Sequence, residues 1–300
     1  MSFIYILIYI GKLLLCGLVF SVGTIIGGVA CSLLGLQPPQ LPENYSAASA
    51  IQNLILESPL LALALVVVAR GIAGSFLLRA GILSFLTWIA YTVNTQLEAM
   101  IFSTIRGGFW FTVVGFLVPS LMCGAAVALL FSPVEKVGSL VEAWKVFFRH
   151  RTVGDWIWRL AIAAVIFMPI YYFFGLLVAP FTKQYYQHSM YGLKLPGLEP
   201  MLTILFVRSI LFLLACVPVI VMWQKSMKTL ILSLGFTLFL LVGFLNMIAA
   251  NYLPLSVRVP HILEILADSL VYTSALVLLL CKRYIITKQE DRVIEQNARV

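Results

Sequence analysis

The sequence PMLTILFVRSILFLLACVPVIVM, residues 200–222, is almost entirely apolar and contains one charged side chain, Arg208. About 20 apolar residues in an α-helix match the ~30 Å hydrocarbon core of a lipid bilayer. We therefore predict that this run crosses a membrane as a helix, with Arg208 about 12 Å below the outer boundary. A charge at that depth is costly unless it is paired or wetted, so the run predicts a polar site inside a membrane fold.

Runs of this kind recur along the chain and dominate its composition. Of the 300 residues, 62% are hydrophobic and 11% are charged, whereas about a quarter of a soluble domain is charged. The alternating pattern of a transmembrane β-barrel is absent. We predict an all-α, polytopic integral membrane helix bundle of about eight spans, in one transmembrane domain that covers residues 1–283. The predicted spans are residues 9–34, 58–79, 82–104, 109–131, 157–178, 200–222, 229–250 and 260–281.

The distribution of Lys and Arg predicts the orientation of these spans, because cytoplasmic loops are enriched in basic residues. The segments that alternate as outer loops hold only Arg106, Lys183, Lys194 and Arg258. We therefore expect both termini in the cytoplasm, with a short tail at residues 284–300, and the plasma or inner membrane as the location. The prediction depends on a tight turn near Arg79, since its loss would invert every later span.

Residues 135–151, EKVGSLVEAWKVFFRHR, have apolar residues at intervals of three and four, which is typical of an amphipathic helix. Trp144 belongs to the apolar face, and Lys136, Lys145 and Arg149 belong to the polar face. Such a helix lies on an anionic membrane surface, so membrane lipid is the expected partner. The alternative is a helix docked on another part of the protein.

This helix divides the chain into two sets of four spans, residues 1–134 and 152–283. The second predicted span of each half contains an arginine, Arg70 or Arg208, and the third contains an asparagine, Asn94 or Asn246. Parallel repeats of this kind occur in transporters. The halves are therefore a possible internal repeat.

Polar residues within the predicted spans gather in the outer half of the bilayer. On the last span, about 100° per residue places His261 and Asp268 within ~20° of each other and Glu264 within ~60°. A polar pocket that opens outward would satisfy all of these groups together. Its candidate substrate-binding or ion-binding residues are Asp268, Glu264, His261, Glu98, Arg208, Arg70, Asn94 and Asn246.

The predicted outer loop between Pro180 and Pro200 is rich in aromatic residues. It contains Tyr185, Tyr186, His188 and Tyr191, which could cover such a pocket. Tyrosines of the membrane interface are the plainer interpretation.

Three functions are compatible with these buried charges. A transporter of a small solute, coupled to protons or ions, would use the carboxylates as ion sites and an arginine as their partner. A scaffold or accessory subunit would use the same residues as structural ion pairs. An intramembrane enzyme would use His261 with Glu264 or Asp268, but the chain contains no HExxH or GxSxG motif.

Metal, cofactor and nucleic-acid partners find little support in the sequence. The five cysteines lie in or beside apolar runs without a CxxC pair, so neither a disulfide framework nor a zinc site is expected. His261, Glu264 and Asp268 form the only weak candidate for a metal site, because zinc usually requires further convergent ligands. Basic residues are dispersed, which does not indicate nucleic-acid binding, and no cofactor is predicted.

Overall fold

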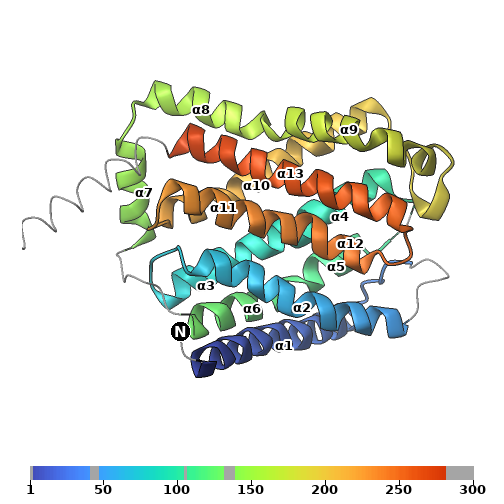
Figure 1. The fold of residues 1–300 in the computed structure, drawn as a ribbon, viewed down its shortest axis with the longest axis horizontal. Coiled ribbons are helices and arrows are strands. Elements are labelled where there is room, and N and C mark those ends of the chain that lie inside the picture. The colour runs from blue at the N-terminus through green and yellow to red at the C-terminus, as the bar shows by residue number, and fades with distance from the viewer. Residues whose placement is uncertain (1–2, 41–46, 105–106, 132–138, 282–300) are drawn as a thin grey trace, which may run out of the picture.

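The computed structural model describes residues 3–40, 47–104, 107–131 and 139–281, and within these ranges the regular structure is helical. Eight helical segments are long and apolar enough to cross a membrane, which confirms the predicted polytopic all-α bundle. Figure 1 shows these segments side by side along the longest axis of the molecule. The predicted tail at residues 284–300 lies outside the described residues.

Several of the eight spans contain more than one helical element. The spans are α1 (Phe3–Leu33); α2 (Ala47–Ala69); α3 (Phe76–Thr87) with the π-helix η1 (Trp88–Val93) and α4 (Asn94–Phe102); α5 (Phe109–Gly115) with α6 (Leu117–Leu130); α8 (Val153–Val165) with α9 (Phe167–Gln187); α10 (Leu198–Met222); α11 (Met227–Leu238) with the π-helix η3 (Phe239–Phe244) and α12 (Leu245–Ala249); and α13 (Leu255–Leu280). The 3-10 helix η2 (Met190–Gly192) follows α9.

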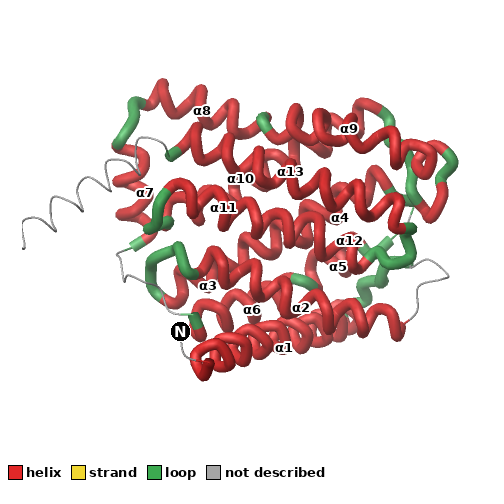
Figure 2. The backbone as a smooth tube through the Cα atoms, viewed as in Figure 1, coloured by secondary structure: helices red, strands yellow, loops and turns green. Residues whose placement is uncertain are grey.

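The remaining helix, α7 (Leu140–Arg149), lies across one end of the bundle, as the tube in Figure 2 makes clear. We call this the α7 end and the opposite one the far end. The basic-residue pattern predicts that the α7 end is cytoplasmic. That orientation remains a prediction.

α7 is amphipathic, and its apolar face packs on the protein. Phe147 is 1% exposed, and the Phe148 ring lies 4.7 Å from that of Trp156 at the start of α8. Trp144 stacks on Phe148 at 5.3 Å. The apolar face of α7 is thus docked on the protein, which was the alternative to a membrane-surface helix. Lys145 and Arg149 are exposed, so contact of the polar face with anionic lipid remains a prediction, and Lys136 lies outside the described residues.

Glycines let α1 approach its neighbours closely. A Cβ atom at Gly27 would overlap the backbone carbonyl of Gly115, and one at Gly23 would lie 2.7 Å from the Cα atom of Pro119. Small residues allow such backbone contact between membrane helices, where packing replaces the hydrophobic effect as the driving force. The glycine-rich face of α1 therefore fixes this helix against α5 and α6, while much of its other surface is apolar and exposed.

We predict that Gly27→Ala destabilises the bundle by about 1–3 kcal/mol, because the added methyl group cannot fit without moving a helix. Gly11→Ala on the same helix is the control, since nothing lies within 4 Å of a Cβ atom there. Thermal unfolding can be followed with a thiol-reactive dye because all five cysteines are buried and free. Equal melting temperatures for the two variants would contradict the close contact.

The turn between the second and third spans differs from the prediction. α2 ends at Ala69 and α3 begins at Phe76, so the chain turns at residues 70–75 and not near Arg79. Arg79 lies inside α3 and is 1% exposed. The number of crossings is unchanged, so the alternation of the later spans does not invert.

Arg79 joins three helices at the α7 end. Its Nη1 donates to the carbonyl of Ala128 at 3.0 Å, and its Nη2 donates to the carbonyls of Ala69, at 3.0 Å, and Phe131. These carbonyls belong to the last turns of α2 and α6 or follow them, where helical partners are missing and a positive charge is favourable. Arg79 is therefore a structural cation and not a loop charge.

We expect Arg79→Met to lower the free energy of unfolding by about 3 kcal/mol or more, because three buried carbonyls lose a charged donor. Arg70→Met is the matched control, since Arg70 is exposed just beyond the end of α2. The same thiol assay measures both variants. If Arg79→Met has the same melting temperature as the wild type, the guanidinium does not stabilise these helix ends.

Other span boundaries also differ from the prediction, most of all at the far end. The second span begins at Ala47 and not at residue 58. The fifth span continues to Gln187, so Tyr185 and Tyr186 project from the last turn of α9 and do not belong to an outer loop. The last span begins at Leu255, and Arg258 lies in its first turn, where its Nε donates to the carbonyl of Met247 at 2.7 Å. α9 and α13 are therefore longer at the far end than their apolar runs.

The third spans of the two halves share a local distortion. Each contains a π-helix of six residues, η1 or η3. Asn94 and Asn246 follow these π-helices, and each donates its Nδ2 to the carbonyl five residues earlier, that of Ile89 at 3.3 Å or Leu241 at 3.0 Å. The two asparagines therefore have matching roles in helix geometry.

The segments that precede these spans contact each other at the α7 end. Ile72 and Trp223 form an antiparallel bridge: the Ala73 N–H donates to Met222 at 3.0 Å, and the Gln224 N–H donates to Gly71 at 2.9 Å. Ser75 and Ser226 then cap α3 and α11 in the same way. The division into two halves and their origin as a repeat remain predictions.

Candidate polar site within the membrane bundle

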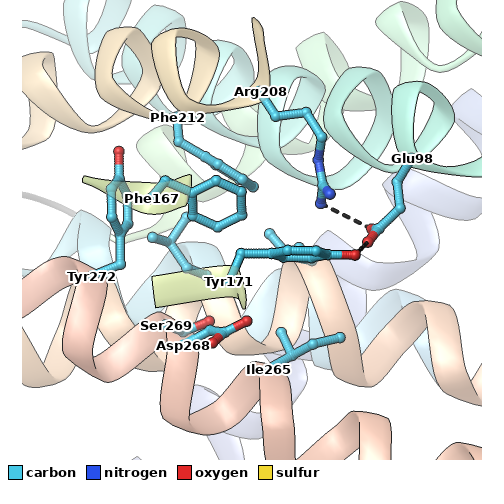
Figure 3. Close-up of a pocket in the computed structure, with 11 residues that line it drawn as sticks. Glu98, Phe167, Tyr171, Arg208, Phe212, Ile265, Asp268, Ser269 and Tyr272 are labelled. Atoms are coloured by element: carbon cyan, nitrogen blue, oxygen red, sulfur yellow. Dashed lines mark hydrogen bonds and ion pairs between the residues drawn. The ribbon is translucent and has the colours of Figure 1, made fainter. Parts of the chain in front are cut away.

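A small cavity lies between α4, α9, α10, α13 and the segment around η3 (Figure 3). Its volume of about 30 Å³ is room for about two water molecules. Three charged residues line it, Glu98, Arg208 and Asp268, each from a different helix. Aromatic side chains form much of the remaining wall, namely Phe167, Tyr171, Phe212 and Tyr272.

Arg208 pairs with Glu98 at one side of the cavity. Its Nη2 lies 2.9 Å from Glu98 Oε2, and the Tyr171 hydroxyl donates to Glu98 Oε1 at 3.0 Å. The guanidinium also lies 5.5 Å from the ring centres of Phe167 and Tyr171, where the π-electron faces attract a cation. Arg208 is therefore held by one carboxylate and by rings on α9.

The two partners differ in their access to solvent. The Arg208 side chain is 1% exposed and that of Glu98 is 27% exposed. Glu98 lies in the last turns of its span, close to the far end, whereas Arg208 lies near the middle of α10. The partly exposed carboxylate therefore lies on the side of the cavity nearest the far end.

Asp268 lies across the cavity from this pair. Figure 3 shows Asp268 on α13 and Arg208 on opposite sides of the Tyr171 ring. Among the described residues, the ion pairs within 4.0 Å do not include one between Asp268 and Arg208. The prediction that these groups share one cavity therefore agrees with their positions, although Arg208 faces Glu98 and not Asp268.

Several polar atoms around the cavity are buried without a hydrogen-bond partner among the described residues. They are Asp268 Oδ1, Arg208 Nε and Nη1, and the Tyr272 hydroxyl. Asp268 is 5% exposed, and about nine in ten buried polar groups in proteins are hydrogen-bonded. The carboxylate and the guanidinium thus retain bonding capacity that water, a proton or a small ion in the cavity would use.

A second polar group lies next to the cavity, toward the far end. His261 Nδ1 is 2.6 Å from Glu264 Oε2, and His261 Nε2 is 3.0 Å from the Tyr186 hydroxyl of α9. Glu264 is 6% exposed and precedes Asp268 by four residues, so both carboxylates lie on the same side of α13. The predicted polar stripe of the last span is therefore continuous with the cavity.

Arg70, which we expected in the polar pocket, does not line this cavity. It is exposed one residue after the end of α2, and its guanidinium lies 5.7 Å from the Tyr9 ring centre. Burial and the nearby charge of Arg70 lower the pKa of Lys225, a residue of the loop between α10 and α11. Arg70 thus belongs to the basic surface of the α7 end.

Two further groups of candidates have other positions than predicted. Asn94 and Asn246 do not line the cavity, because both amides bond to their own π-helices. His261, Glu264 and Asp268 do not form a metal site: in the described ranges, no three His, Cys, Asp or Glu side chains converge as ligands.

The sequence reasoning missed the aromatic wall. Phe167 and Tyr171 lie four residues apart on α9, and Phe212 lies four residues after Arg208 on α10. This spacing puts each pair on one helix face. Aromatic residues are so frequent in this chain that the pattern alone did not distinguish a cavity wall from a lipid-facing surface.

No protein-family model matches this sequence, and no curated protein or solved structure shows significant similarity to it. The functional argument therefore depends on the chemistry of the cavity and its neighbours.

We predict that Glu98→Gln lowers the free energy of unfolding by about 2 kcal/mol, because the buried guanidinium loses its charged acceptor. Adding Arg208→Gln should restore part of this loss, since the double variant no longer contains an unpaired buried charge. Thermal unfolding of the two single variants and the double variant gives the coupling free energy. Glu199→Gln on the exposed start of α10 is the control, and strictly additive effects would show that the pair is not coupled.

Proposed function

We propose that this integral membrane protein is a proton-coupled transporter of a small solute, with Asp268 as the proton-binding carboxylate. The observation that supports this most is the cavity itself. It lies among membrane-spanning helices and contains a buried carboxylate oxygen and two guanidinium nitrogens that have no hydrogen-bond partner in the part of the chain that the structure describes. Ionisable groups that face a polar space inside a membrane bundle are typical of ion and proton pathways.

The size of the cavity favours a proton as the species bound in this conformation. About 30 Å³ admits about two water molecules but no organic solute. Burying an ionised carboxylate without partners costs much more than burying the neutral acid. A proton supplied through water would therefore stabilise Asp268 where it lies, and the solute would bind in a more open conformation.

Arg208 offers a way to couple this proton to a conformational change. Its Nη2 contacts Glu98, while Nε and Nη1 remain without partners. An ionised Asp268 would compete with Glu98 for the guanidinium, and a protonated Asp268 would not. Such an exchange would link proton binding to the relative positions of α4, α10 and α13.

The closest alternative is a membrane scaffold or accessory subunit. The direct Arg208–Glu98 pair supports it, because buried ion pairs often fix helix packing and specificity. The two functions differ in what they require of Asp268. A structural carboxylate would stabilise the bundle in its ionised form, whereas a proton site would be stable as the neutral amide of asparagine.

We predict that the protein, reconstituted in liposomes on a solid-supported membrane, gives a transient charge displacement after a pH jump. The charge arises because a proton moves into the membrane to reach Asp268. Asp268→Asn should remove at least about nine tenths of it, since an amide does not bind a proton in this range. The same variant should melt at or above the wild-type temperature.

The control is Glu142→Gln, which changes an exposed carboxylate of α7 and should keep the full charge displacement. A sodium jump at constant pH tests whether Na⁺ replaces the proton. No charge displacement in the wild type, or an unchanged one in Asp268→Asn, would contradict the proposal. A large loss of stability in Asp268→Asn would favour the structural alternative.

A further inference from the structure

Tyr186, His261 and Glu264 form a hydrogen-bonded chain that ends one helical turn from Asp268. The Tyr186 hydroxyl lies 3.0 Å from His261 Nε2, and His261 Nδ1 lies 2.6 Å from Glu264 Oε2. We infer that this chain is the route by which protons from the far end enter the cavity and reach Asp268. The inference rests on the proposed function and names the residues that control the proton-binding step.

The positions of the three α13 residues define the direction of the route. His261 lies about two turns from the start of the helix, and its side chain is 19% exposed. Glu264 follows by three residues and has a side-chain exposure of 5%, and Asp268 follows by four more. At ~1.5 Å per residue, the route covers about 10 Å along the helix axis, from a solvent-accessible imidazole to a buried carboxylate.

Glu264 has room to take part in the transfer. Gly175 of α9 faces it, and a Cβ atom at Gly175 would lie 3.3 Å from Glu264 Oε1, tighter than most real contacts. One Glu264 oxygen thus contacts His261 while the other lies against a helix surface without a side chain. Oε2 is therefore the oxygen placed to accept a proton from His261, and Asp268, four residues further along α13, is the carboxylate to which Glu264 would pass it.

His261 is the one imidazole in a largely acidic neighbourhood. Tyr186 of α9 bonds His261, and Tyr171 of α9, Tyr186 and Asp268 of α13 interact with Glu264. The other charged or titratable groups lie one step further away. Glu98 of α4 and Arg208 of α10 are next to Tyr171 and Asp268, Tyr252 before α13 is next to Tyr186, and Arg258 of α13 bonds the Met247 carbonyl. The segment η3–α12, which also packs on α13, contains no titratable residue. Histidine is the side chain that most readily gains and loses a proton near neutral pH, so it suits the entry of the route.

The proton transfers balance along the chain. The Tyr186 hydroxyl passes its proton to His261 Nε2 and takes one from solvent, and the proton on Nδ1 passes to Glu264 Oε2. Glu264 then releases a proton through cavity water to Asp268, which becomes neutral, while His261 returns to its first tautomer before the next transfer. Release to the far end reverses these steps, and no other reactant is required.

The test is the rate of the charge displacement after a pH jump in the reconstituted full-length protein. We expect His261→Ala and Glu264→Gln to slow its rise at least about tenfold, the lower range of what a positioned acid or base contributes. The total charge should remain, because Asp268 still binds the proton. Added imidazole should speed up the rise of the charge displacement in His261→Ala but not in Glu264→Gln.

Matched controls exist on the same side of the molecule. His188→Ala changes an exposed histidine just after α9, and Tyr185→Phe changes a neighbouring tyrosine that bonds Ser256 instead of His261. Both should keep the wild-type rate, whereas Tyr186→Phe should alter the pH dependence of the rate. His261→Gln, which keeps a polar side chain of similar size, should be slow even if His261→Ala folds poorly.

The outcomes separate this inference from the proposed function. The charge displacement of His261→Gln and Glu264→Gln could rise at the wild-type rate while Asp268→Asn shows no charge displacement. In that case the proposed route is wrong, and Asp268 remains the proposed proton site. If His261→Ala loses total charge and imidazole does not restore the rate, the histidine is structural and the route is also wrong. A wild-type protein without any charge displacement would overturn the proposed function itself.

Discussion

The arrangement of this bundle depends on the requirement that every charge within the hydrocarbon region be neutralised inside the protein. Arg79 and Arg208 meet this requirement in different ways. The guanidinium of Arg79 donates three hydrogen bonds to carbonyls at the ends of α2 and α6 and leaves only its Nε without a partner in the described ranges. Arg208 has one carboxylate partner, and two of its nitrogens have no hydrogen-bond partner among the described residues. Arg79 therefore joins helix ends at the α7 end, and Arg208 lines a polar cavity inside the bundle.

The same requirement explains which parts of the fold were predictable from sequence. Apolar runs determine the number of spans because only helices of about that length satisfy their backbone in lipid. They do not determine the ends, as α9 and α13 show. Tyr185, Tyr186 and Arg258 are polar enough to resemble loop residues, yet all three lie in helices and bond to neighbouring elements.

The two arginines near the turn between the second and third spans show most clearly what the sequence could not predict. Arg70 and Arg79 are nine positions apart in an otherwise apolar stretch, and either could mark the turn. Distinguishing them requires knowledge of the carbonyls that Arg79 reaches on α2 and after α6, which are contacts between distant parts of the chain. Helical spacing, by contrast, is local information, and it correctly placed His261, Glu264 and Asp268 on one stripe of α13. Glu98 was among the predicted pocket residues, but its pairing with Arg208 and its contact with Tyr171 were beyond such reasoning.

The buried charges differ in how fully they are paired, since Arg79 bonds three carbonyls whereas Arg208 and Asp268 are not paired with each other. This difference is the strongest argument against a purely structural site. If packing alone required Arg208 and Asp268, pairing them directly would satisfy both, as the carbonyls satisfy three donors of Arg79. Instead, the Tyr171 ring lies between them, and its hydroxyl adds to the stabilisation of Glu98. Asp268 is thereby kept buried and without a cation beside it, at the inner end of a stripe that begins with a solvent-accessible histidine. Burial without a partner disfavours the charged form of a carboxylate, and this is why we propose Asp268, and not the paired Glu98, as the proton site.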